Sequence, residues 1–294
     1  MRREAILVLC CVLFAPGLSL SPAAGPRPDI LGKLKVAKRT VKVFGQQIAY
    51  YESGRGKTVM LLPNLTWDSH AWSQNLAAMS EKYHVIALDL PGTGESAKPL
   101  IEYKMDTWTD FIAEFMRLKG IPKTTIVGAV MGGALAVQFA LDHPDMSEAL
   151  VCAASNSGPG KHEGGLRPEN WPSLAGTKRL LLASFHDKSL VTDALVRARF
   201  EDRLRVDDGY TVARHLADHR VPYSVKELSE IRVPALFVWC REDEITPLKW
   251  GEDYAAAAPG AQLAVIEGCG HLPNLEKPEE FNRAVIAFLD KKVR

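Results

Sequence analysis

This sequence has almost no excess of charge of either sign. Its 36 Lys and Arg residues are balanced by 35 Asp and Glu residues, which leaves a formal net charge of +1. No basic tract longer than a few residues occurs, whereas proteins that bind nucleic acid concentrate Lys and Arg to neutralise phosphates. The composition therefore excludes nucleic acid as a partner.

Long apolar runs are also missing. The longest, residues 5–14, is shorter than the roughly 20 residues that a transmembrane helix needs. Arg2 and Arg3 precede it, and small residues at positions 21–23 follow it at the spacing of a signal-peptidase site. We therefore predict that residues 1–23 are a signal peptide and that the chain is exported, to the periplasm or the extracellular space, without a stable membrane span. Retention of this segment as a membrane anchor is the less favoured alternative.

Cysteine is scarce, with five in the whole chain, two of them inside the predicted signal peptide. The remaining three, Cys152, Cys240 and Cys269, are an odd number that permits one disulfide at most. Cys152 and Cys240 fall at the ends of two predicted strands, which makes them a candidate pair. The default interpretation is that all three are free and buried, because cysteine packs well as a small apolar group.

Apolar strands alternate with helices over most of the chain. Such an alternation is typical of an α/β fold, a mostly parallel, doubly wound sheet that helices cover on both faces. A hairpin is predicted at residues 40–44 and 47–51, and strands at 59–62, 84–89, 124–127, 149–153, 235–240 and 262–266. Helices are predicted at residues 71–82, 107–119, 131–141, 250–257 and 279–289.

The alternation stops between the strands at 149–153 and 235–240. This region begins with a glycine-rich stretch at 158–165 and continues with helical patterns at 180–185, 191–205 and 212–219. A helical block between two strands of one sheet is an insertion, and its glycine-rich start favours mobility. We predict a core formed by residues 35–157 and 232–294, with residues 158–231 as a helical lid.

A tight turn between the strand at 124–127 and the next helix carries the most informative motif. Gly128, Val130 and Gly132 have the spacing of a nucleophile elbow, glycine-x-serine-x-glycine, in which the central residue occupies a strained strand-to-helix turn. Glycine is needed at the flanking positions because only hydrogen lets the backbones approach closely. Valine has neither a lone pair nor a transferable proton. Position 130 therefore cannot act as a nucleophile in acyl transfer.

Other landmarks follow in a fixed order. They are the run Asp89-Leu90-Pro91-Gly92-Thr93-Gly94-Glu95-Ser96, the turn at 240–243 with Pro247, and Gly268-Cys269-Gly270-His271 followed by Pro273. Together with the elbow they make the chain, from about residue 40 to its end, closely resemble the α/β-hydrolase fold family. The inserted segment, with residues 189–192 and Arg199, is loosely similar to the lid of carbon–carbon bond hydrolases that cleave ring-fission products.

The resemblance implies roles for individual residues. Asp243 stands where the family places its triad acid, and His271 where it places its base. A carboxylate bound to one ring nitrogen fixes the tautomer, so the other nitrogen can take a proton. The backbone N–H groups of Leu65 and Met131 would be the oxyanion donors. Val130 occupies the nucleophile position and is inert.

The sequence departs from the family pattern at neighbouring positions. Ala129 replaces the histidine that is common before the nucleophile, and Pro63-Asn64 replaces His-Gly on the loop that helps to form the oxyanion hole. Together with Val130, this clustering favours natural divergence. By the same correspondence, residues at the pocket or in the lid are Pro63, Asn64, Ala129, Arg199 and Leu272.

No cofactor or metal site is predicted. Residues 54–58 resemble the end of a phosphate-binding loop but precede a strand, so a surface turn is the better interpretation. His215 and His219 lie one helical turn apart without a third ligand at useful spacing. Hydroxyl or thiol groups that could replace the missing serine are loop residues, interpreted as bonding to the backbone: Thr66, Ser69, Ser155, Ser157 and Cys269.

Three functions remain open, all with a small, largely apolar molecule as the partner. The first is an enzyme that works by general acid–base chemistry through the His271–Asp243 dyad without a covalent intermediate, of the lyase or cofactor-free oxygenase type. The second is a non-catalytic protein that binds a small ligand. The third is a hydrolase with a displaced nucleophile or a water activated by His271.

Overall fold

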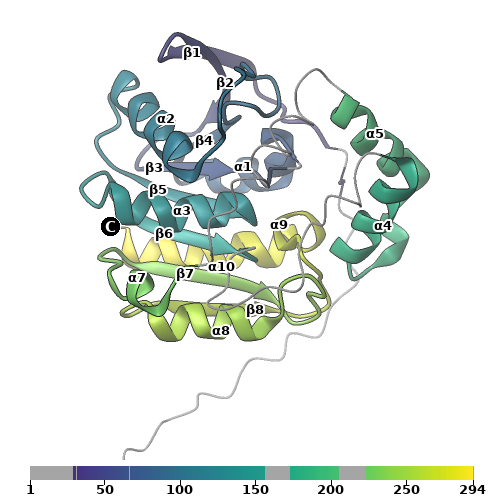
Figure 1. The fold of residues 1–294 in the computed structure, drawn as a ribbon. Coiled ribbons are helices and arrows are strands. Elements are labelled where there is room, and N and C mark those ends of the chain that lie inside the picture. Colours follow the sequence, from purple (N-terminus) through teal and green to yellow (C-terminus); the bar gives the residue numbers. More distant parts are fainter. Residues whose placement is uncertain (1–28, 31, 66, 156–172, 205–222, 294) are drawn as a thin grey trace, which may run out of the picture.

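The computed structural model describes residues 29–30, 32–65, 67–155, 173–204 and 223–293 (Figure 1). The predicted signal peptide and the helix expected at 212–219 lie outside these ranges. Within them, the chain forms one eight-stranded sheet with helices on both faces, so the predicted fold class is confirmed.

The sheet has the strand order β1-β2-β4-β3-β5-β6-β7-β8. Strands β3 to β8 pair in parallel, whereas β2 runs antiparallel to both β1 and β4. The central strands are uninterrupted apolar runs because helices cover both faces of them. The strands are β1 (Lys38–Val43), β2 (Gln46–Ser53), β3 (Thr58–Leu62), β4 (His84–Leu88), β5 (Thr124–Ala129), β6 (Ser147–Ala153), β7 (Ala235–Cys240) and β8 (Gln262–Ile266).

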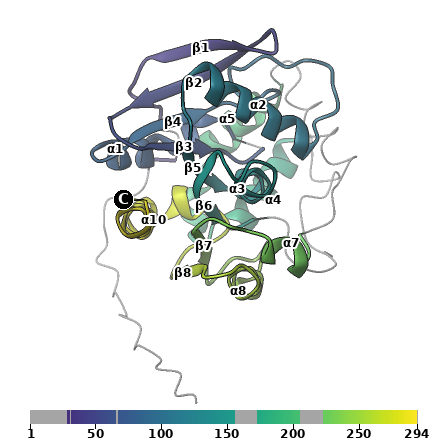
Figure 2. The same ribbon diagram turned by 90° about the vertical axis from the view of Figure 1, so that its left-hand side faces the viewer.

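Two layers of helices bury the two faces of the sheet (Figure 2). On one face, α2 (Met105–Leu118), α3 (Met131–Asp142) and α8 (Leu248–Ala257) pack over a core that includes Trp108 and Phe237. On the other face, α1 (Ser73–Ser80) and α10 (Pro278–Lys292) pack over a second core. The helix predicted at 71–82 begins later than expected, because residues Ser69–Trp72 form a 3₁₀ turn, η1.

The segment between β6 and β7 is helical where it is described. It contains α4 (Leu174–Ser184), the 3₁₀ turn η3 (Lys188–Leu190), α5 (Asp193–Leu204) and α7 (Val225–Ser229). Helices α4 and α5 lie beyond the sheet, at the end to which the arrowheads of β6 and β7 point (Figure 1). We call α4 and α5 the inserted helices. The short helices α7 and α9 (Pro273–Glu276) were not expected, because four or five residues carry no readable period.

The candidate disulfide between Cys152 and Cys240 is wrong. Cys240 is bonded to Cys269, with 5.3 Å between the Cα atoms, and Cys152 is a free, buried thiol. Cys240 is the last residue of β7 and Cys152 is the last but one of β6, but the two strands pair with Cys152 opposite Phe237. Strand register therefore offsets the two thiols, and the loop after β8 brings Cys269 to Cys240.

Candidate functional site

The turn between β5 and α3 has the geometry of a strained elbow. Val130 has φ 55° and ψ −109°, a left-handed conformation that β-branched residues rarely adopt. Its N–H donates to Ala153 O on β6 at 2.8 Å. A Cβ atom on Gly128 would lie 1.9 Å from Gly132 O, and one on Gly132 would lie 2.2 Å from Leu62 O. Both glycines are therefore required by close backbone contacts, as the sequence predicts.

The side chain of Val130 is 1% exposed and lies in a compact apolar cluster. The cluster joins the elbow to the loop after β3, to the inserted helices and to the His271 loop. Its members besides Val130 are Trp67, Ala71, Leu181, Phe185, Leu190, Val191, Leu195, Val196, Leu272 and Leu275. The side chain at the elbow thus faces apolar groups, and Leu272 belongs to the same buried cluster. Its role as a pocket residue stays a prediction.

His271 and Asp243 meet across the loops that follow β8 and β7. The His271 Nδ1 atom lies 2.9 Å from Asp243 Oδ2, and both side chains are almost completely buried. A carboxylate can only accept, so Nδ1 carries the proton and Nε2 has a free lone pair. Among the described residues Nε2 has no hydrogen-bond partner. The arrangement can accept a proton from a bound molecule and hold the resulting positive charge; its catalytic role stays a prediction.

Thr246, which sequence reasoning missed, completes the surroundings of Asp243. Its N–H and that of Ile245 each donate to Asp243 Oδ1 at 2.8 Å, and its hydroxyl donates to Oδ2 at 2.6 Å. Burial alone raises the pKa of Asp243, but the charge of protonated His271 and the hydrogen bonds from His271 and Thr246 hold that pKa below its ordinary value. The sequence signal that could have indicated Thr246 is its position three residues after an aspartate in a turn, where a hydroxyl and a backbone N–H can both bond to the aspartate.

The backbone groups expected as oxyanion donors have no other partner in the part of the chain that the structure describes. Neither the N–H of Leu65 nor that of Met131 has an acceptor among the described residues. Met131 is the first residue of α3, where N–H groups have no acceptor inside the helix. Pro63 and Asn64 are buried beside them, and the carbonyl oxygen of Asn64 accepts the N–H of Trp67 at 2.9 Å. Their role in binding an oxyanion is not tested by this geometry.

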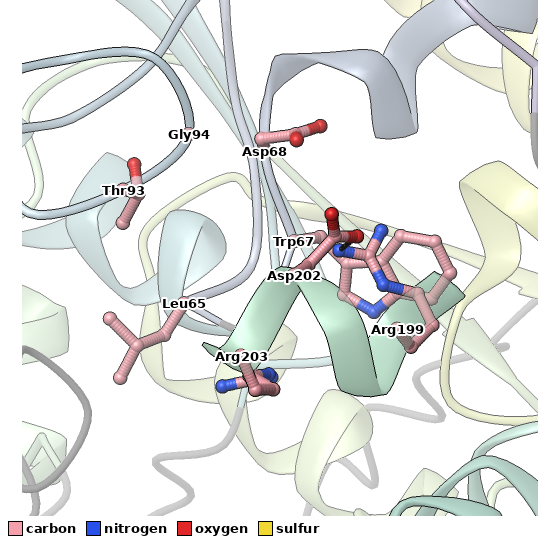
Figure 3. A pocket seen from close by; sticks show the side chains of 8 residues that line it. All are labelled: Leu65, Trp67, Asp68, Thr93, Gly94, Arg199, Asp202 and Arg203. Atoms are coloured by element: carbon pink, nitrogen blue, oxygen red, sulfur yellow. Dashed lines mark ion pairs between the residues drawn. The ribbon is translucent and has the colours of Figure 1, made fainter. Parts of the chain in front are cut away.

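A cavity of about 260 Å³ is lined by residues 30, 32 and 33, by the loop at 67–71 and by α5. It adjoins the site through Trp67 and Ala71, which also belong to the apolar cluster around Val130. The Arg199 guanidinium lies over the Trp67 ring, 4.3 Å from its centroid, and pairs with Asp202 at 2.5 Å. Figure 3 shows Arg199 and Asp202 from α5 facing Trp67 and Asp68. The Arg199 Nε atom is buried and has no partner among the described residues. The predicted pocket residue Arg199 therefore lines a hollow, and Lys33 adds a second cation there.

The hydroxyl and thiol groups considered as displaced nucleophiles find no support. Cys269 is consumed in the disulfide, and Ser69 and Ser155 are fully buried. Thr66 and Ser157 lie outside the described residues. Ala129 is a buried end residue of β5, which adds no reactive group.

No group of three or more His, Cys, Asp or Glu side chains in the described part of the chain is arranged to hold a metal ion. His215 and His219 lie outside that part. Within the described ranges, no helix is long and apolar enough to cross a membrane.

Comparison with known proteins places the chain in a family. Residues 57–278, most of the chain, match the alpha/beta hydrolase fold family. The chain belongs to the α/β-hydrolase fold family. This membership agrees with the sheet order, the elbow and the paired Asp243 and His271.

Within the α/β-hydrolase fold family the chain is homologous to hydrolases of meta-cleavage products. It is 30% identical over 263 residues to a 2-hydroxy-6-oxononadienedioate/2-hydroxy-6-oxononatrienedioate hydrolase of Burkholderia vietnamiensis, covering 83% of this chain and 91% of the relative. It is 31% identical over 258 residues to a 2-hydroxy-6-oxo-6-phenylhexa-2,4-dienoate hydrolase of Burkholderia cepacia, covering 81% and 89%.

A solved structure shows the same likeness. The meta-cleavage product hydrolase from Pseudomonas fluorescens IP01, in a serine-to-alanine variant complexed with acetates, matches with a TM-score of 0.80 and 27% identity. The match covers 87% of this chain and 98% of that chain.

Proposed function

We propose that this protein binds a small, largely apolar molecule between the sheet and the inserted helices and transfers a proton on it through His271 and Asp243, without a covalent intermediate. The observation that carries the proposal is the His271 Nδ1 to Asp243 Oδ2 hydrogen bond at 2.9 Å, which leaves Nε2 as a base. Val130 at the elbow supplies no group that could form a bond to substrate.

The substrates for which the relatives are named suggest a substrate class. A 2-hydroxy-6-oxo-dienoate contains an enol and a ketone, and the relatives' names describe its hydrolysis. Moving the enol proton from oxygen to carbon requires a base and an acid but no nucleophile. We therefore propose that His271 Nε2 takes the hydroxyl proton of such an enol and returns it to carbon, giving the keto tautomer. The guanidinium of Arg199 already pairs with Asp202, and its Nε–H, which has no partner among the described residues, is the group that would bind a carboxylate end.

The test replaces His271 by Ala and measures turnover of a 2-hydroxy-6-oxo-dienoate by its ultraviolet absorbance, with ligand affinity measured by calorimetry. General acid–base catalysis is worth roughly 10²–10⁴-fold, so we expect a loss of at least about 100-fold with affinity nearly unchanged. His186→Ala is the matched control, because His186 is exposed and only its backbone N–H is used. If H271A and wild type turn over the substrate at equal rates, both above the uncatalysed rate in solution, the proposal is wrong.

A second candidate is a ligand-binding protein without turnover. The observation that favours it is the apolar cluster around Val130, since an apolar floor suits burial of a small molecule. Under this alternative, wild type binds the dienoate but converts it no faster than H271A does. The third alternative, a hydrolase that uses a displaced nucleophile or an activated water, predicts cleaved carbon–carbon products or labelling of the wild type by a fluorophosphonate.

A further inference from the structure

A second buried carboxylate joins the His271 loop to the inserted helices. Glu276 is the last residue of α9 and is 4% exposed. Its Oε2 atom accepts the N–H groups of Gly270, at 2.7 Å, and of His186, at 3.1 Å. Its Oε1 atom accepts the N–H of Asp187 at 2.7 Å. Gly270 directly precedes His271, whereas His186 and Asp187 follow α4, so one side chain binds both segments.

The same two segments also touch directly. The His271 N–H donates to the carbonyl oxygen of Ser184, the last residue of α4, at 2.7 Å. A Cβ atom on Gly270 would lie 2.6 Å from Ser184 O and 2.8 Å from His186 N, closer than real Cβ contacts. There is consequently no room for a side chain between the His271 loop and the end of α4.

Helix α4 also forms part of the surface that faces the elbow. Leu181 lies on α4 and Phe185 is its C-cap, and both belong to the apolar cluster that contains Val130. A molecule bound against Leu181 or Phe185 would contact the end of α4. Any shift of that end acts on the two backbone segments that Glu276 holds together.

We propose that Glu276 is a positioning residue: it holds His271 Nδ1 on Asp243 and makes this hydrogen bond follow the position of α4. A buried carboxylate has to be compensated, and no cation pairs with Glu276 in the part of the chain that is described. Three backbone N–H groups supply that compensation. Glutamine cannot replace Glu276, because its amide NH₂ group would face one of the three backbone N–H donors, and two donors cannot form a hydrogen bond.

The inference rests on the proposed function only in treating His271 and Asp243 as the working pair. The test of the inference therefore measures the hydrogen bond between His271 and Asp243 in the substrate-free protein. Nuclear magnetic resonance of the ¹⁵N-labelled protein detects the His271 Nδ1–H and its exchange with water. In Glu276→Gln we expect this exchange to accelerate at least about tenfold, as for a weakened charge-assisted hydrogen bond. Glu276→Asp keeps the charge on a shorter side chain and should recover part of the protection.

The matched control is Glu279→Gln. Glu279 is exposed in the first turn of α10, close to Glu276 in sequence, and the exchange of the His271 Nδ1–H should stay unchanged there. If Glu276→Gln lowers thermal stability but leaves the His271 Nδ1–H as protected as in wild type, Glu276 has a structural role only and the inference is overturned.

A second measurement covers the case in which Glu276→Gln does not fold. In the wild type, amide exchange should show Gly270, His186 and Asp187 opening together, at one common rate. Exchange of the Gly270 amide that is more than about tenfold faster than that of the other two would overturn the inference, because amides held by one group open with it. Absence of turnover with every substrate would refute the proposed function and leave this result intact.

Discussion

Val130 occupies a strained strand-to-helix turn with an unreactive side chain. Its φ of 55° is unfavourable for a β-branched residue, and such strain costs roughly 1–3 kcal/mol. The conformation persists because Ala153 accepts the Val130 N–H and because Gly128 and Gly132 allow close backbone contact. The chemistry of this position is decided by one side chain, whereas its geometry is decided by the neighbours.

Restoring serine at position 130 tests whether the rest of the site can still support acyl transfer. We expect Val130→Ser to be labelled stoichiometrically by a fluorophosphonate, because the Nε2 atom of His271 and the N–H groups of Leu65 and Met131 have no competing partners in the described residues. Intact-mass measurement detects the adduct. Val130→Ala and the double variant with His271→Ala are the controls. No labelling of Val130→Ser would show that the loop with Pro63 cannot form an oxyanion hole.

Asp89 is a buried carboxyl that holds two loops. It is 1% exposed and accepts the N–H groups of Ser69, at 2.7 Å, and Glu95, at 2.9 Å. Burial, reinforced by the negative charge of Asp68, raises the pKa of Asp89 to about 7 from its ordinary 3.8. Between these values the folded protein binds a proton that the unfolded chain releases. The contribution of Asp89 to the free energy of unfolding therefore falls as pH rises from about 4 to about 7.

Asp89→Asn should remove this pH dependence. We expect the difference in unfolding free energy between wild type and Asp89→Asn to fall as pH rises from 4 to 7, by up to about 4 kcal/mol, and to be flat above pH 7. Urea unfolding at several pH values measures it. Asp145→Asn, at an exposed carboxyl, is the control. A difference that does not change over this window would contradict the prediction.

The loops after β7 and β8 act as one element because several bonds join them. Cys240 and Cys269 form a disulfide, and Arg241 pairs with Glu267 through two hydrogen bonds at 2.9 and 2.8 Å. Glu242 accepts the N–H of Gly268 at 2.8 Å. The disulfide lies three residues before Asp243 and two residues before His271. The relative position of the acid and the base is therefore fixed by covalent and polar links.

Removal of the disulfide should destabilise the fold. The bond closes a loop with a sequence separation of 29, for which the chain-entropy estimate is about 3–4 kcal/mol. We expect Cys240→Ala/Cys269→Ala to lose about this much free energy of unfolding in urea, and a reductant to bring the wild type to the same value. The double variant itself should not respond to reductant, and Cys152→Ala should keep the full response. An unresponsive wild type would contradict the prediction.

On the scale of the whole molecule, the candidate site residues lie together at the carboxyl ends of the parallel strands. The parallel strands β5, β7 and β8 end at the same edge, and Val130, Asp243 and His271 lie on the connections that follow them. Residues on connections at the carboxyl ends of parallel strands are the usual location of ligand sites in such sheets. Helices α4 and α5 lie over this edge (Figure 1), and the cavity beside Trp67 and Arg199 opens there.

Export is a prediction at the scale of the whole chain. We propose that residues 1–23 are removed and that the disulfide forms in an oxidising compartment. Alkylation of the unfolded, unreduced mature protein should then label Cys152 alone, because Cys10 and Cys11 leave with the signal peptide. Mass spectrometry of the recovered protein reads the labelled cysteines. Recovery of a chain labelled at Cys10 and Cys11 would contradict export with cleavage.

The sequence alone determined the fold class and the elbow at Val130, because strand and helix periodicity and glycine requirements are local properties of the chain. The candidate pair of Asp243 and His271 came from the resemblance to the α/β-hydrolase fold family. Sequence reasoning misplaced the disulfide and missed Thr246 and Glu276. Only the tertiary structure decided these, since strand register separates Cys152 from Cys240, and two of the donors to Glu276, His186 and Asp187, lie 90 and 89 residues from it in the chain. Contacts between distant segments depend on how the sheet and the inserted helices pack, and local patterns do not encode that packing.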